Sequence, residues 1–120
     1  MVDYKKRVLI VDDEVAIANI FSKMFSKLNC SCVCAVNGQK GLEAFTQEPF
    51  DAVFTDLKMP VMDGARLTQE IRKRDSKIPI FIVTGYNPRL DESVGYTEII
   101  YKPVLLDTFR NKLQECVRSV

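Results

Sequence analysis

Acidic, hydroxyl and amine side chains stand directly after short apolar runs of this 120-residue chain. Asp12 and Asp13 follow RVLIV, Asp56 ends DAVFTD, Thr84 ends IFIVT, and Lys102 follows EIIY. If these residues converge, the carboxylates repel one another unless a hard divalent cation, best of all Mg²⁺, neutralises them. A carboxylate beside such an ion can attack phosphorus and form an acyl phosphate. The lysine ammonium and the threonine hydroxyl would then bind phosphoryl oxygens.

Each of these residues also has an ordinary structural interpretation. An acidic pair such as Asp12-Asp13 can cap a following helix, because a carboxylate satisfies free amides at a helix N-terminus. Thr84 alone would be a strand-end hydroxyl, Lys102-Pro103 a turn, and Asp56 a strand terminator. The chemical interpretation depends on all of them lying at one edge of one sheet.

Composition removes several classes of function. With no histidine in the chain, a Ser-His-Asp triad, a Cys-His pair and histidine metal ligation are excluded. The net charge is +1 with Lys and Arg spread along the chain, so we expect no direct nucleic-acid partner. No apolar stretch approaches the roughly 20 residues of a membrane span, which predicts a cytoplasmic protein. Cys30, Cys32 and Cys34 alternate as in a strand, which favours packed thiols over a zinc site.

Apolar runs alternate with segments of helical period along the chain. We expect strands at 7–11, 31–36, 51–56, 80–84 and 98–101, and helices at 15–29, 39–47, 65–74 and 105–118. This alternation predicts one domain over residues 1–120, with a core of about 7–118, built as a three-layer α/β sandwich with a parallel sheet. In the flavodoxin-like strand order 2-1-3-4-5, taken from known folds of this type, the acidic strand ends would meet.

Five motifs in order, LIVDDE, AVNGQKGLEAF, DAVFTDLKMPVMDG, IFIVTG and YKPV, resemble the receiver domain of two-component response regulators. The resemblance runs from about residue 7 to residue 118. It implies a phosphohistidine of a sensor histidine kinase or phosphotransfer protein as the phosphoryl donor. It also implies these roles: Asp56 as phosphoacceptor, Thr84 and Lys102 completing the site, and Mg²⁺ bound by Asp13, Asp56 and the backbone carbonyl of Lys58, with Asp12 assisting through water.

The chain departs from this family pattern at two places. The position three residues before Lys102, usually aromatic, is Ile99, while the aromatic residue is Tyr101. The segment from Thr84 to Gly95 is about four residues short, so we expect a stunted or irregular fourth helix and a monomer or weak dimer. The resemblance also implies a cis peptide at Lys102-Pro103.

Three functions are carried forward. The favoured one is a phosphorylation-dependent module that controls a partner protein of unknown identity or relays phosphate. The second is a degenerate receiver that acts as a phosphorylation-independent scaffold, suggested by Ile99 and the short fourth helix. The third is a small phosphatase with an aspartyl nucleophile. Two observations argue against it: no D-x-D motif follows the first strand, and no residues remain to build a cap over a substrate.

Overall fold

The computed structural model describes residues 6–118, which form one parallel sheet with helices on both sides. The strands have the spatial order β2-β1-β3-β4-β5. Their bounds are β1 Lys6–Val11, β2 Cys30–Ala35, β3 Ala52–Asp56, β4 Ile80–Thr84 and β5 Glu98–Tyr101. The helices are α1 Val15–Lys27, α2 Gly38–Gln47, α3 Gly64–Arg72 and α4 Leu106–Arg118. The predicted fold class and strand order are therefore confirmed.

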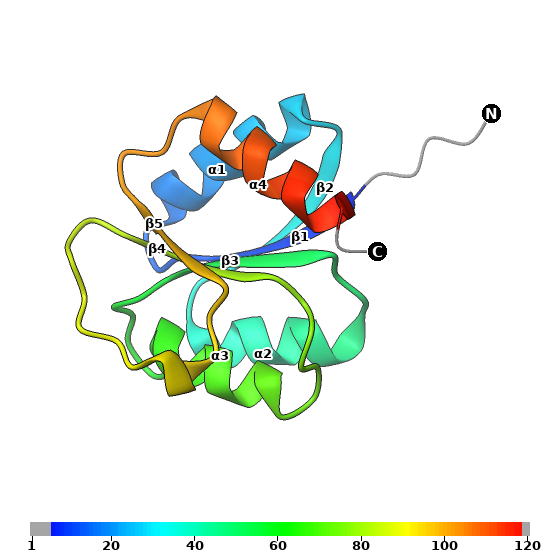
Figure 1. The fold of residues 1–120 in the computed structure, drawn as a ribbon. Helices are drawn as coiled ribbons and strands as arrows, with labels where there is room; N and C mark the ends of the chain where they lie inside the picture. Colours follow the sequence, from blue (N-terminus) through cyan, green and yellow to red (C-terminus); the bar gives the residue numbers. More distant parts are fainter. Residues whose placement is uncertain (1–5, 119–120) are drawn as a thin grey trace.

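Two apolar layers separate the sheet from its helices, with α1 and α4 on one face and α2 and α3 on the other (Figure 1). Phenylalanines dominate the α1–α4 side, where the Phe54 ring lies 4.8 Å from that of Phe25 and 4.7 Å from that of Phe81. On the other side, aliphatic residues such as Leu67 and Ile71 of α3 pack against the strands. Burial of both faces explains why the strands are nearly continuous apolar runs.

The connection from β4 to β5 contains a three-residue 3₁₀ turn, η1, at Glu92–Val94 in place of an α-helix. The expectation of a stunted fourth helix is confirmed, and the label α4 therefore belongs to the last helix. Gly95, with a φ of 96°, ends the turn in the left-handed conformation that glycine adopts without strain. The expected cis peptide at Lys102-Pro103 is present.

The alternating cysteines of β2 point toward α1. Cys30 is buried in the layer beneath α1 and α4, Cys32 packs against that layer, and the Cys34 thiol donates a hydrogen bond to the Ala18 carbonyl at 3.9 Å. Burial, reinforced by the neighbouring Cys30 and Cys34, raises the pKa of Cys32 to about 12. All three thiols are free; Cys30 and Cys32 act as packing groups, as the sequence predicted, whereas Cys34 is exposed.

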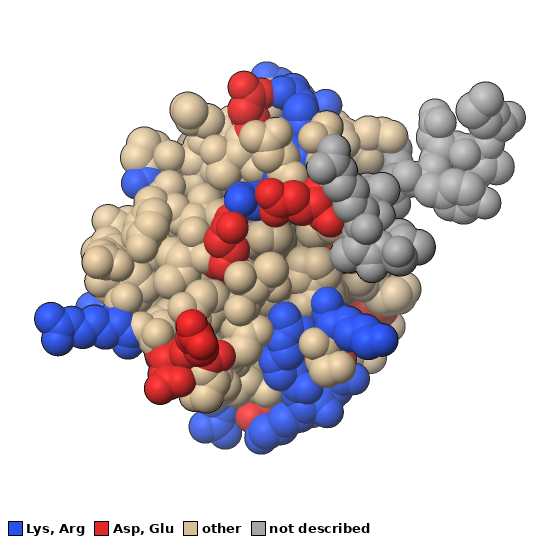
Figure 2. All heavy atoms as spheres, in the orientation of Figure 1, with Lys and Arg blue, Asp and Glu red and all other residues tan. Residues whose placement is uncertain are grey.

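The surface carries both signs of charge. Figure 2 shows Lys and Arg gathered over the lower part of the face in view, where α3 and the loop after it lie, with acidic groups close by. Interspersed charges of this kind give no extended positive stripe on that face. Within residues 6–118, no helix has the length and apolar character needed to cross a membrane.

Candidate functional site

Three carboxylates meet at the carboxyl edge of the sheet. Asp12 directly follows β1 and is buried, Asp13 is exposed beside it, and Asp56 is the last residue of β3. One oxygen from each of the three carboxylates lies within 4.8 Å of the other two. Because β1 and β3 are neighbours in register from Val8 to Val11, their ends come together, as the strand order predicts.

Asp12 is held in place by the backbone around it. Its amide donates a hydrogen bond to the Ala35 carbonyl at 3.0 Å, and its Oδ1 accepts one from the Glu14 amide at 2.9 Å. Glu14 is the residue that precedes α1. The capping interpretation is thus partly right, because Asp12 does satisfy an amide at the start of the helix. Its Oδ2 is left to face the cluster.

Lys102 supplies the positive charge of the cluster. Its Nζ lies 3.3 Å from Asp12 Oδ2 and 3.6 Å from Asp56 Oδ2, and its side chain is only 23% exposed. The Lys102 amide also donates to the Thr84 carbonyl at 2.8 Å, which fixes the residue just after β5. One ammonium against three carboxylates leaves excess negative charge, so the cluster has the oxygen ligands and the charge that suit a hard divalent cation.

The electrostatic environment disfavours a bare carboxylate at Asp56. Burial raises its pKa, and the nearby Asp12 and Asp13 raise it further, whereas Lys102 and a 2.8 Å hydrogen bond from the Leu57 amide to Oδ1 lower it. The net shift is upward because desolvation is the largest of these effects. Added positive charge in the cluster would therefore stabilise the ionised form that a nucleophile requires.

Thr84 is the last residue of β4, the strand that pairs with β3 and so lies next to Asp56. Asp56 pairs in register with Val83, so the buried Thr84 side chain lies one residue further toward the site edge. Its Oγ1 accepts a long hydrogen bond of 3.4 Å from the Tyr86 amide. The structure thus brings Asp12, Asp13, Asp56, Thr84 and Lys102 to one edge of the sheet.

Comparison with known proteins agrees with this geometry. The sequence profile of the response regulator receiver domain matches residues 8–114. The chain belongs to this family. Among curated relatives, a probable transcriptional regulator, ycf27 of Guillardia theta, is 41% identical over 91 residues, covering 76% of this chain and 35% of that protein. The chain spans about half or less of the length of the curated relatives it matches.

Solved receiver structures superpose closely on this receiver domain. A CheY-like receiver domain protein of Methanospirillum hungatei JF-1 is 28% identical with a TM-score of 0.86, covering 98% of this chain and all of that one. The response regulator TrrA of Thermotoga maritima, solved in complex with Mg²⁺-BeF, is 27% identical with a TM-score of 0.85, covering 92% of this chain and 98% of that one.

Lys58 lies in the loop between β3 and α3 of this receiver domain, with an exposed side chain. Its Nζ is 5.1 Å from the centre of the Tyr86 ring, a cation–π contact between neighbouring loops. Sequence reasoning did not single out Tyr86. Only its position, two residues after Thr84 on the loop that follows β4, could have indicated that it lies near the site.

Proposed function

We propose that this receiver domain is a signalling phosphoacceptor that takes its phosphoryl group on Asp56 in a Mg²⁺-dependent reaction. A carboxylate oxygen of Asp56 attacks phosphorus of a phosphohistidine on a sensor histidine kinase or phosphotransfer protein. The new P–O bond forms as the P–N bond breaks, and the imidazole leaves. The observation that carries the proposal is the convergence of three carboxylates at the ends of β1 and β3, two of which, Asp12 and Asp56, also pair with Lys102.

The residues present fit a magnesium ion. Asp12, Asp13 and Asp56 offer oxygens within 4.8 Å of one another, and the Lys58 backbone carbonyl, two residues past Asp56, would add a neutral oxygen ligand. When bound, the ion supplies positive charge between the nucleophile and the anionic phosphoryl group. That the solved relative TrrA carries Mg²⁺-BeF supports this assignment.

The chain's own groups would orient the phosphoryl group. The Leu57 amide holds Oδ1 of Asp56 at 2.8 Å, while Oδ2 lies on the side of Lys102. The Lys102 ammonium would pair with one phosphoryl oxygen, and the Thr84 hydroxyl would donate a hydrogen bond to another. Asp12 and Thr84 are almost completely buried, which holds their side chains in place, whereas Asp13 is exposed to solvent.

Acetyl phosphate as a small-molecule donor tests the proposal. With Mg²⁺ we expect the intact mass of the wild type to rise by one phosphoryl group, and to stay unchanged with EDTA or in Asp56→Asn. No adduct on the wild type would favour the phosphorylation-independent scaffold. Repeated turnover of a generic phosphomonoester would favour the phosphatase instead.

Partners and setting follow from the same chemistry. The donor would be a cytoplasmic kinase or phosphotransfer domain, and the output a change of affinity for a partner protein rather than direct binding of nucleic acid. In the described residues no α-helix lies between β4 and β5. A dimer whose interface used a helix at that position could therefore not form here. We therefore infer a monomer or weak dimer.

A further inference from the structure

Tyr86 is held by two contacts, and both partners are groups that a phosphoryl group on Asp56 would attract. Its amide donates to Thr84 Oγ1 at 3.4 Å, and its ring lies under Lys58 Nζ at 5.1 Å. This inference rests on the proposed function, because it starts from phosphorylated Asp56. Tyr86 itself is 42% exposed.

Both present contacts of Tyr86 are weaker than the contacts that a phosphoryl group would offer to Thr84 and Lys58. A hydrogen bond of 3.4 Å is near the distance limit of the interaction, and a cation–π contact at an exposed site is weak. A phosphoryl group brings a charge of roughly −1.5 to −2 and short, charge-assisted hydrogen bonds. The Thr84 hydroxyl and the Lys58 ammonium should therefore turn toward the phosphoryl oxygens, which releases Tyr86 on both sides.

The next residue along the chain connects this event to β5. The Tyr101 hydroxyl donates a hydrogen bond to Asn87 Oδ1 at 3.1 Å. Consecutive Cα atoms are only about 3.8 Å apart, so a displacement of Tyr86 is passed to Asn87. Tyr101 is the last residue of β5, pairs in register with Thr84, and is 51% exposed.

Ile99, the residue at the position that the family pattern makes aromatic, offers no hydroxyl for a polar contact. It pairs with Ile82 inside the sheet and is half-buried. The neighbouring η1 turn is only three residues long.

We propose that Tyr86 and Asn87 form a relay that carries the phosphorylation state of Asp56 to Tyr101, whose exposed ring is the surface that changes.

Fluorine NMR of the chain labelled with 3-fluorotyrosine tests the relay. Tyr→Phe variants assign the signals, and Mg²⁺ with beryllofluoride serves as the probe for the phosphorylated state. We expect the Tyr86 and Tyr101 signals to shift on addition of the probe. Tyr96, just before β5 and so at the opposite edge of the sheet, is the internal control and should stay in place.

Asn87→Ala separates the relay from a general effect of the probe. In this variant the Tyr86 shift should remain and the probe-dependent Tyr101 shift should be lost. Asn87→Asp, which keeps an acceptor for the Tyr101 hydroxyl, should restore it. A Tyr101 shift of unchanged size in Asn87→Ala would overturn the relay, as would a silent Tyr101 in a wild type that takes up phosphate from acetyl phosphate. Failure of phosphate uptake itself would instead count against the proposed function.

Discussion

Two loops at the carboxyl edge of the sheet are built in opposite ways. The β3–α3 loop, which follows Asp56, is fixed by backbone contacts: the Gly64 amide donates to the Leu57 carbonyl at 2.8 Å, and the Gly38 amide donates to the Met62 carbonyl at 3.0 Å. A Cβ at Gly38 would lie 2.4 Å from the Met62 carbonyl oxygen, and one at Gly64 even closer to the backbone of β3. These close backbone contacts leave little room for the two ends of this loop to shift.

The β4–β5 connection has a backbone tie at its end, where the Thr97 amide donates to the Ile80 carbonyl at 2.7 Å, but side chains hold the rest of it to the fold. Arg72 of α3 donates from Nε to the Gly95 carbonyl at 2.8 Å, and the Asn87–Tyr101 hydrogen bond closes the other end. Side-chain contacts of this kind can be exchanged for others without breaking the sheet. The comparison suggests that the rigid loop positions the chemistry and the exchangeable one carries the signal.

The largest expected effect comes from Gly64→Ala. The new Cβ would lie 2.1 Å from the Asp56 carbonyl oxygen, so the end of β3 must move. We expect a loss of about 3 kcal/mol or more in the free energy of unfolding, measured with urea, and loss of phosphoryl uptake. Gly85→Ala in the other loop is the matched control, because no atom lies within 4 Å of its Cβ. Equal losses in both variants would contradict the contrast between the loops.

Arg72→Met is expected to come next. It keeps the aliphatic stem but removes the hydrogen bonds from Nε to Gly95 and from Nη1 to the Asp75 carbonyl at 3.2 Å. We expect a loss of about 1–3 kcal/mol and faster amide hydrogen exchange in η1. Lys77→Ala, an exposed residue in the segment between α3 and β4, is the control. Unchanged exchange around Gly95 would show that Arg72 does not hold this connection.

Asp56→Asn should stabilise the protein at neutral pH without Mg²⁺, which would appear as a higher urea midpoint. The raised pKa of Asp56 means that the folded state disfavours its ionised form, because burial and the nearby Asp12 and Asp13 outweigh Lys102. Wild-type stability should therefore fall as the pH rises from the ordinary value of 3.8 through the raised pKa, and the variant should lack this fall.

Thermal unfolding of both proteins with and without Mg²⁺ sharpens the Asp56 test. An ion that binds only the folded site stabilises the wild type, and it should stabilise Asp56→Asn less because one ligand has lost its charge. A wild type more stable than the variant in EDTA at neutral pH would show that the Lys102 ion pair outweighs the cost of burial.

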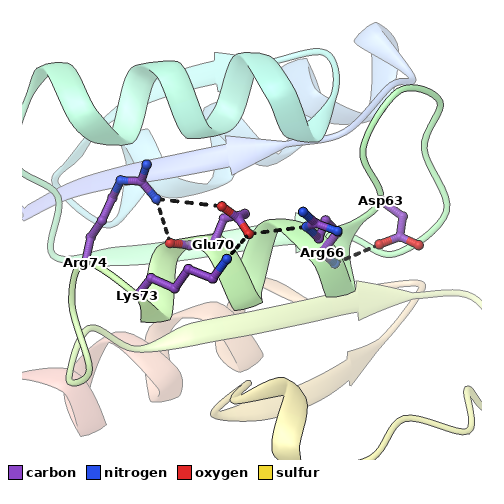
Figure 3. A network of polar contacts seen from close by, with 5 residues as sticks. All are labelled: Asp63, Arg66, Glu70, Lys73 and Arg74. Atoms are coloured by element: carbon purple, nitrogen blue, oxygen red, sulfur yellow. Dashed lines mark hydrogen bonds and ion pairs between the residues drawn. The ribbon is translucent and has the colours of Figure 1, made fainter.

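Lys73→Ala on α3 should have the smallest effect. Figure 3 shows Arg66, Lys73 and Arg74 converging on Glu70, with Lys73 Nζ at 2.8 Å and Arg66 Nε at 3.3 Å from its Oε2. Because Lys73 is exposed and two other cations remain, the urea midpoint should not change measurably. A clear drop in the urea midpoint would mean that Lys73 stabilises α3 despite its exposure.

Most of the architecture could be predicted because the chain is locally consistent. The apolar runs, which are buried on both sheet faces, the cap residue Asn37 before α2 and the cap residue Asp63 before α3 each indicate the same alternation. The helix ends were predicted less accurately: α3 was expected at 65–74 and spans Gly64–Arg72. The helix begins one residue earlier than expected because the Asp63 side chain caps it by accepting a hydrogen bond from the Arg66 amide.

The contacts of the β4–β5 connection could not be predicted. Nothing in the spacing of Lys58 and Tyr86 along the chain indicates that the ammonium lies over the ring, since the two residues belong to different loops. The same is true of Asn87 and Tyr101. Such contacts depend on the path of a segment without regular structure, for which periodicity gives no information.

The sequence alone determined the chemistry at the edge of the sheet, because acidic, hydroxyl and amine residues placed after parallel strands must arrive at the same edge. Tertiary structure alone decided the charge balance and the connections around that edge. The distance of Lys102 from two carboxylates, the upward pKa shift of Asp56 and the contact of Lys58 with the Tyr86 ring depend on burial and on the approach of separate loops. Neither is encoded in any single stretch of residues.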